Sequence, residues 1–344
     1  MGQFARVIIP PVRSCDAVQP LPRSTHLVRL HGQTMGTTWS ASLYDASPGR
    51  ALVIDAGIKA ALAEVVVQMS PWEPASDLSR FNRAPAGTWH QLPPLFFTVL
   101  KTALTLARAT GGAFDPTLGA AVGAWGFGPE GPRAQVPSPE EVATSAASSG
   151  WARIEIDRQR QAARQPGGIR LDLCGIAKGF AVDHVAEALK RLNLRDYLVE
   201  VGGELRGEGV KPDGSPWWVA IDRPPMDQLG DGEAGSVLDT VIALHGASIA
   251  TSGDYRRFLE SGGRRYPHTI DPNTARPVEN ALASVTVLHP SCMHADALAT
   301  ALTVMGPVRG MRHACGHGLA ALFITRSKRG LATSLSPALA RMLE

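Results

Sequence analysis

Short apolar segments with the length and pattern typical of β-strands recur along the chain. They cover residues 27–30, 39–44, 153–156, 169–173, 197–201, 217–221, 237–244, 247–251, 284–288 and 319–325. Apolar positions at helical spacing predict helices over residues 58–69, 94–110, 140–149, 176–193 and 296–305. Strands and helices do not alternate regularly, so the pattern predicts a mixed α+β fold and not a doubly wound dinucleotide-binding fold.

The beginning of the chain differs from the rest. Residues 1–25 contain Pro10, Pro11, Pro20 and Pro22 and show no apolar periodicity, so we expect a flexible N-terminal arm. Residues 26–344 are expected to form a single domain. The turn at residues 32–37, which joins its first two strands, can bring backbone close to a ligand.

Composition excludes several classes of protein. The chain has 344 residues, of which 44% are hydrophobic, so it can bury a sizeable core. Its net charge of +3 is too small to indicate binding to nucleic acid or to a membrane surface. No segment approaches the roughly 20 apolar residues of a membrane span, and no signal-peptide core or lipobox precedes Cys15. We therefore expect a cytoplasmic protein, or a periplasmic one if the true start differs.

A glycine turn joins a strand-like segment to the most regular predicted helix. Its backbone N–H groups and the side chain of Lys178 can bind phosphate, and Asp183, further along the helix, can accept from ribose or adenine donors. The alternative is an ordinary connection with a solvated Lys178, because the turn is neither a Walker loop nor a G-x-G-x-x-G motif.

Two groups of residues could bind a metal ion. Asp296 and Thr300 are four residues apart, on one helix face, and with a nearby carbonyl they would offer the oxygen ligands that magnesium takes. Alternatively, Asp296 interacts with the helix dipole and Thr300 bonds to the carbonyl of Asp296. His313, Cys315 and His317 could hold zinc in principle, but no second Cys or His pair supports this.

Two further residues lie in polar, turn-rich segments. His268 is flanked by turn formers, so it can be a general base or a surface histidine bonded to a carboxylate. Trp72 can be a stacking platform or can simply pack within its loop.

Together and in this order, these segments resemble the ApbE family of FAD:protein FMN transferases, from about residue 26 to residue 325. The matching segments are TMGT (34–37), SDLSRFN (76–82), FDPT (114–117), DLCGIAKG (172–179), VGGEL (201–205), TSGDY (251–255), HTIDP (268–272) and ADALAT (295–300). So many collinear matches are not explained by chance. The resemblance implies an α+β fold with largely antiparallel sheets and two lobes that hold FAD in a cleft.

The same resemblance implies a role for individual residues. Those expected to bind FAD are Met35, Trp72 and Asp115 along the flavin and ribityl chain, Lys178 and Asp183 at the nucleotide end, and Ile270. Those expected to hold Mg²⁺ are the Ala177 carbonyl, the Asp296 carboxylate and the Thr300 hydroxyl, and His268 matches the catalytic histidine. The chain departs from the family pattern at Trp72, usually tyrosine, at Cys174, usually glycine, and at Glu204, more often aspartate.

The reaction implied by the resemblance is a phosphoryl transfer. A Thr or Ser hydroxyl of a target flavoprotein attacks the FMN-side phosphorus of FAD, and AMP leaves. Mg²⁺ and Lys178 offset the developing charge, and His268 takes the proton. Two alternatives stay open: hydrolysis of FAD to FMN and AMP, and a protein that binds or delivers FAD without chemistry.

Overall fold

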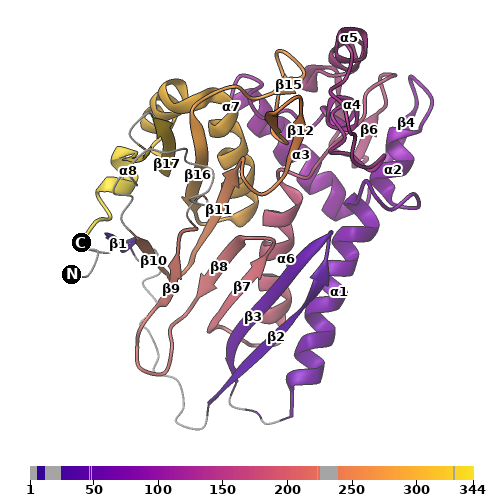
Figure 1. Ribbon diagram of the computed structural model, residues 1–344. Helices are drawn as coiled ribbons and strands as arrows, with labels where there is room; N and C mark the ends of the chain where they lie inside the picture. Colours follow the sequence, from indigo (N-terminus) through magenta and orange to yellow (C-terminus); the bar gives the residue numbers. More distant parts are fainter. Residues whose placement is uncertain are drawn as a thin grey trace.

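A long antiparallel sheet organises the molecule. The computed structural model describes residues 6–11, 25–45, 47, 49–222, 224, 239–327 and 330–344. Its largest sheet has eight strands in the order β18-β17-β16-β11-β8-β7-β3-β2, and all neighbouring strands run antiparallel (Figure 1). The strands are β2 (His26–Thr34), β3 (Thr37–Asp45), β7 (Tyr197–Val201), β8 (Glu204–Glu208), β11 (Ala247–Gly253), β16 (Leu282–His289), β17 (Ala320–Ser327) and β18 (Gly330–Leu335).

Three helices cover one face of this sheet. They are α1 (Ala51–Met69), α6 (Ala177–Arg191) and α7 (Cys292–Gly316), and Figure 1 shows α1 and α6 behind the strands. Inward-facing residues of the strands, such as Trp39 and Val199, alternate with outward-facing ones and pack against these helices. Helix α7 is broken at Gly306, whose φ of 75° is followed by Pro307.

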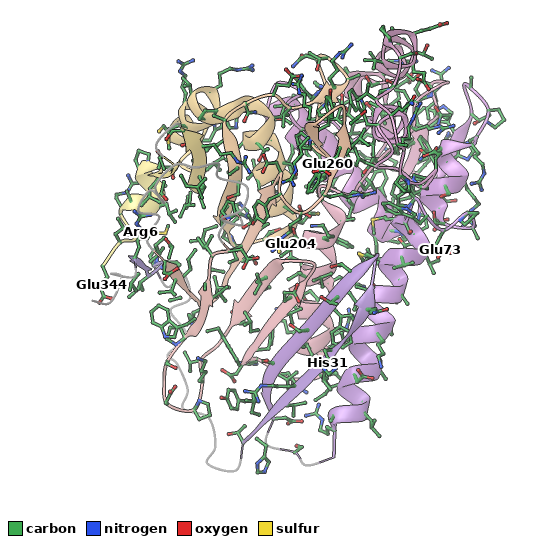
Figure 2. All side chains as sticks on the ribbon, in the orientation of Figure 1. Arg6, His31, Glu73, Glu204, Glu260 and Glu344 are labelled. Carbon is green, nitrogen blue, oxygen red and sulfur yellow. The ribbon has the colours of Figure 1, made fainter. Side chains whose placement is uncertain are left out.

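A small sheet covers part of the opposite face. It contains β1 (Arg6–Ile8), β10 (Thr240–Leu244) and β9 (Trp217–Ala220), and β1 runs parallel to β10. Its apolar side packs on outward-facing residues of β11 and β17 and on α8 (Pro337–Ala340). Arg6 and Glu344 lie close together in Figure 2, because the Glu344 N–H donates to the Val7 carbonyl.

The upper part of Figure 1 is built by the chain between α1 and α6 and by hairpins that follow β11. Its helices are α2 (Asp77–Asn82), α3 (Pro94–Ala109), α4 (Gly119–Ala124), α5 (Pro139–Ala147) and the 3₁₀ helix η1 (Trp151–Arg153). Its strands are β4 (Trp89–Gln91), β5 (Glu155–Asp157), β6 (Ala162–Arg164), β12 (Phe258–Ser261), β13 (Arg264–Pro267), β14 (Ile270–Asp271) and β15 (Arg276–Pro277). Leu118, Trp125, Phe127 and Ile270 form a separate small core there.

The predicted mixed α+β fold is confirmed, but two segments differ from the prediction. Residues 169–173 do not form a strand beyond one bridge between Arg170 and Leu118. Their backbone instead bonds to loops, since the Leu171 N–H donates to the Asn82 side chain and the Asp172 N–H to the Pro116 carbonyl. The apolar pattern predicts no helix over residues 77–82, but these residues form α2, which is capped by Ser76.

The N-terminal segment also differs from the expected flexible arm. Residues 6–8 form strand β1, and Ile8 is fully buried against the small core beneath β9 and β10. The β-branched pair Val7-Ile8 suits a strand, and β10 offers an edge for it. Residues 12–24 lie outside the described residues. Across the described ranges, no helix is long and apolar enough to span a membrane.

We predict that Ile8→Ala lowers the free energy of unfolding by about 2–5 kcal/mol, because it leaves a cavity in a buried cluster. Ile9→Ala is the matched control, since Ile9 is 42% exposed, and should change stability by about 0.5 kcal/mol or less. Urea unfolding of both variants measures the difference. If both variants lowered the free energy of unfolding by the same small amount, residues 6–9 would not contribute to the folded core and would belong to the flexible arm.

Candidate active site

A cavity of about 500 Å³ lies between the helix-covered sheet and the upper part of the molecule. This volume is in the range of small-molecule and cofactor sites. Its walls include every predicted site residue except Asp183: Met35, Trp72, Asp115, Ala177, Lys178, His268, Ile270, Asp296 and Thr300. The structure therefore brings together segments of the chain that the sequence could only place in order.

The first turns of α6 and α7 cross at the floor of this cavity. Gly179 allows the contact, because a Cβ at this position would lie 2.3 Å from the Cys292 carbonyl oxygen and 2.8 Å from Cβ of Asp296. The N-cap residue of α6, Ile176, provides no side-chain cap. Asp296 of α7 takes this role, since its Oδ2 accepts from the Gly179 N–H at 2.9 Å.

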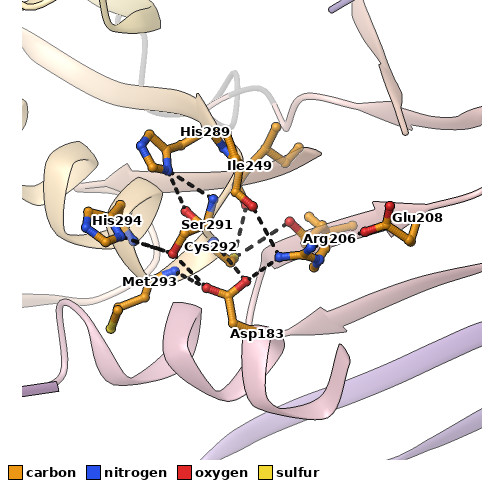
Figure 3. A network of polar contacts seen from close by, with 11 residues as sticks. Asp183, Arg206, Glu208, Ile249, His289, Ser291, Cys292, Met293 and His294 are labelled. Atoms are coloured by element: carbon orange, nitrogen blue, oxygen red, sulfur yellow. Dashed lines mark hydrogen bonds and ion pairs between the residues drawn. The ribbon is translucent and has the colours of Figure 1, made fainter. Parts of the chain in front are cut away.

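Asp183 of α6 caps the start of α7, as Asp296 of α7 caps the start of α6, and it does not line the cavity. Its carboxylate accepts from the Cys292 and Met293 N–H groups, both at 3.0 Å, at the start of α7 (Figure 3). It also accepts from the Ser291 hydroxyl at 2.8 Å and pairs with Arg206 at 3.0 Å. The Asp183 carboxylate already accepts from three groups at the α7 N-terminus and pairs with Arg206 of β8, so this geometry does not support the prediction that it binds the nucleotide end of FAD.

The buried charges at the cavity floor do not balance. Lys178 Nζ lies 2.5 Å from Oε1 of Glu204, which is labelled in the interior of Figure 2. Burial raises the pKa of Glu204 to about 7, with Lys178 opposing and Asp296 adding to the rise. Burial likewise raises the pKa of Asp296. Burial opposes the charge on Lys178, but the two carboxylates raise its pKa above its ordinary value. One lysine thus faces two carboxylates.

This arrangement fits a cation at Asp296. The Oε2 atom of Glu204 is buried with no partner among the described residues, and two buried carboxylates share the single lysine. Thr300 lies one turn after Asp296, and its hydroxyl bonds to the Ser252 hydroxyl at 3.1 Å, not to the Asp296 carbonyl. Ala177, Asp296 and Thr300 all line the same cavity and offer carbonyl, carboxylate and hydroxyl oxygens, the donor set of Mg²⁺.

His268 presents one free ring nitrogen. Its Nδ1–H donates to the Arg257 carbonyl at 3.1 Å, which assigns the proton to Nδ1 and leaves Nε2 as an acceptor. No carboxylate of the described residues binds the ring, so the surface-histidine alternative is not supported. Burial lowers the pKa of His268 to about 4, and the charges of Arg257 and Lys178 lower it further. The ring is therefore neutral near pH 7.

Aromatic and loop residues form the upper wall. Trp72 is 45% exposed at the cavity, and the Arg257 guanidinium carbon lies 6.0 Å from its ring centroid. Met35 reaches the cavity from a two-residue turn, Met35-Gly36, in which both φ angles are positive. Burial raises the pKa of Asp115. Its carboxylate accepts hydrogen bonds from the backbone N–H groups of Thr117 and Trp151. Asp115 therefore shapes the wall mainly by fixing a loop.

Comparison with known proteins agrees with this geometry. The model of the ApbE family matches residues 35–323. The FAD:protein FMN transferase of Haemophilus influenzae is 38% identical over 94% of this chain and 93% of its own length. That of Vibrio cholerae is 41% identical over 88% of this chain and 89% of its own.

Solved structures give the same result. The flavin transferase ApbE of Vibrio cholerae has a TM-score of 0.83 at 38% identity, over 93% of this chain and all of that one. The flavinyl transferase ApbE of Pseudomonas stutzeri, in its apo form, has a TM-score of 0.82 at 37% identity, over 92% of this chain and 97% of that one. The chain belongs to the ApbE family.

Within this ApbE fold, one departure from the family pattern has a structural explanation: Glu204 is long enough for its carboxylate to reach Lys178 from strand β8. Burial raises the pKa of the Cys174 thiol well above its ordinary value, so it stays protonated, but nothing among the described residues explains cysteine in place of glycine there.

Sequence reasoning gave no role to several residues that line the cavity, among them Arg256, Arg257 and Ser252. Nothing in the local sequence distinguishes these arginines from surface arginines. The zinc alternative gains no support, because no cluster of three or more His, Cys, Asp or Glu in the described part of the chain could hold a metal ion. His313 and His317 instead stack on each other, with centroids 4.0 Å apart.

We predict that Asp183→Asn lowers the free energy of unfolding by about 2–4 kcal/mol, because it weakens charge-assisted bonds to the start of α7 and leaves Arg206 short of a partner. Asp55→Asn, which removes a surface pair with Lys59, should cost about 0.5 kcal/mol or less. Thermal and urea unfolding compare the two. An unchanged Asp183→Asn protein would show that α7 does not depend on this cap.

Proposed function

We propose that this ApbE-family protein transfers FMN from FAD to a Thr or Ser hydroxyl of a target flavoprotein and releases AMP. The observation that carries the proposal is the cavity itself, in which two buried carboxylates near Lys178, Glu204 of β8 and Asp296 of α7, lie together with a neutral histidine whose Nε2 is free. These are the parts that a phosphoryl transfer to a hydroxyl needs. The names of the similar transferases support the same reaction.

Each residue has a distinct task in this proposal. Trp72, Met35 and Asp115 line the flavin and ribityl chain, and Ile270 contacts FAD. Lys178, in the first turn of α6, binds the diphosphate, whose charge the helix dipole favours. The neighbouring Ala177 and Gly179 N–H groups already donate to Leu173 and Asp296. Asp296, Thr300 and the Ala177 carbonyl hold Mg²⁺, which would offset the charge that develops on the phosphoryl oxygens.

His268 is the proposed general base. The acceptor hydroxyl donates to Nε2, and the proton moves there as the hydroxyl oxygen attacks the FMN-side phosphorus and AMP leaves. The bond to the Arg257 carbonyl fixes the tautomer and the orientation of the ring. A pKa of about 4 makes His268 a weak base, and a negative diphosphate bound beside it would raise this value.

The reaction is tested by incubating the protein with FAD, Mg²⁺ and a candidate acceptor flavoprotein. A mass gain of one FMN on the acceptor, with release of AMP, supports transfer. Release of FMN and AMP with an unmodified acceptor would instead show hydrolysis, and unchanged FAD would show a binding protein.

We predict that His268→Asn lowers the transfer rate by about 10²–10⁴-fold, the usual contribution of a positioned base, with little change in FAD affinity. Because activity needs neutral His268, and its pKa is lowered to about 4, the acidic loss that disappears in His268→Asn should lie near pH 4 and not near 6.5. Protonation of Glu204, whose pKa is about 7, gives a separate loss that both proteins share. Full activity in His268→Asn would remove the histidine from the mechanism.

We predict that Asp296→Ala abolishes transfer and that Thr300→Val raises the Mg²⁺ concentration needed for half-maximal rate. The first change removes the only charged ligand of the proposed set, and the second removes one neutral oxygen while leaving the cap on α6 intact. Rate is measured against Mg²⁺ concentration after EDTA treatment. A metal-independent rate in the unmodified protein would contradict the assignment.

We predict that Trp72→Ala weakens FAD binding by about 1–3 kcal/mol, if the flavin ring stacks as nucleobases do on aromatic side chains. Trp72→Tyr should be nearly neutral. Trp89→Ala is the control, since Trp89 is 48% exposed but does not line the cavity. Flavin fluorescence gives the dissociation constants. Equal affinities in both alanine variants would place the ring elsewhere.

A further inference from the structure

Arg257 lies directly beside His268. Strands β12 and β13 pair Phe258 with Pro267, so Arg257 and His268 occupy the next opposite positions. The His268 backbone N–H donates to the Arg257 carbonyl at 3.2 Å, and the His268 ring donates to the same oxygen. Opposite residues of antiparallel strands project to the same side, and both side chains line the cavity.

The guanidinium of Arg257 is held at the cavity wall from two sides. Its Nη2–H donates to the Phe127 carbonyl at 2.7 Å. Its central carbon lies 5.7 Å from the Phe127 ring centroid and 6.0 Å from that of Trp72. These contacts use one of five N–H donors, and within the described ranges the others have no acceptor. The group is thus positioned but not satisfied.

Three positively charged side chains of the described residues line the cavity: Lys178, Arg256 and Arg257. Arg257 is the one among them without a carboxylate partner. Lys178 is paired with Glu204, and Arg256 with Asp222. No carboxylate of the described residues lies within salt-bridge distance of Arg257. The positive charge of Arg257 acts on other groups that line the cavity. It lowers the pKa of His268, and it opposes the rise that burial causes in the pKa of Cys174.

We propose that Arg257 binds a non-bridging phosphate oxygen of the FAD diphosphate and holds it beside His268. The inference rests on the proposed function, which supplies the doubly charged diphosphate. A planar guanidinium with free donors suits a phosphate, and Arg257 would add to Lys178, which already gives one of its three donors to Glu204. Arg257 and His268 are opposite residues at the end of the β12–β13 hairpin. Arg257 would therefore fix the position of the phosphate relative to the His268 ring.

The competing explanation is that Arg257 only supports Trp72. The experiment compares FAD with riboflavin, which has the flavin ring but no phosphate, by fluorescence titration of the unmodified protein, Arg257→Gln, Arg257→Lys and Arg265→Gln. Arg265 is the control, because it belongs to the same hairpin, pairs with Glu260 and does not line the cavity.

We expect Arg257→Gln to weaken FAD binding by roughly 10–100-fold and riboflavin binding by less than about twofold. The FAD affinity of Arg257→Lys should lie between those of the unmodified protein and Arg257→Gln, because lysine keeps the positive charge but lacks the planar set of guanidinium donors. FAD affinity of the unmodified protein should also fall more steeply with added NaCl than that of Arg257→Gln. Arg265→Gln should match the unmodified protein.

Two results would overturn the inference: equal FAD affinity in Arg257→Gln and the unmodified protein, or equal loss for FAD and riboflavin. The second would mean that Arg257 acts on the ring through Trp72. These titrations do not require FMN transfer. Failure of the proposed function appears separately, as an unmodified protein that binds FAD and leaves every acceptor unmodified.

Discussion

The site depends on one close contact, the crossing of the first turns of α6 and α7 at Gly179. Any side chain there would collide with the Cys292 carbonyl, and the helices would separate. At this crossing each helix caps the other, Asp296 of α7 at the Gly179 N–H and Asp183 of α6 at the Cys292 and Met293 N–H groups. The two carboxylates hold the helix starts in a fixed relation, and the cavity floor follows from it.

This reciprocal capping explains why a carboxylate can be buried at a site intended for charged ligands. Asp296 is 3% exposed, and burial alone would favour its protonated form. One of its oxygens is held by the Gly179 N–H, so the side chain stays in place without a ligand. Asp296 and Glu204 face the single charge of Lys178, and burial raises the pKa of both carboxyl groups. A bound cation would therefore favour their ionised forms.

Much of the architecture could be predicted from the sequence, and the exceptions share a physical cause. The spacing of Asp296 and Thr300 predicted one helix face, and both line the cavity. By contrast, residues 169–173 have a strand-like apolar run but bond to loops, and Asp183 has a plausible binding chemistry but is used as a helix cap. The local sequence pattern predicts which face of an element a residue lies on. It does not predict which residue, distant in the sequence, forms hydrogen bonds with it.

The two halves of the site are supported by different parts of the molecule. The carboxylates and Lys178 depend on the α6–α7 crossing and the main core. His268 depends on the β12–β13 hairpin, whose Leu259 and Tyr266 pack in the small core with Leu118 and Phe127. The two supports therefore use different cores, and the charge of Lys178, which lowers the pKa of His268, acts between them across the cavity. A molecule with charged and aromatic ends is then what connects the base to the phosphate-binding floor.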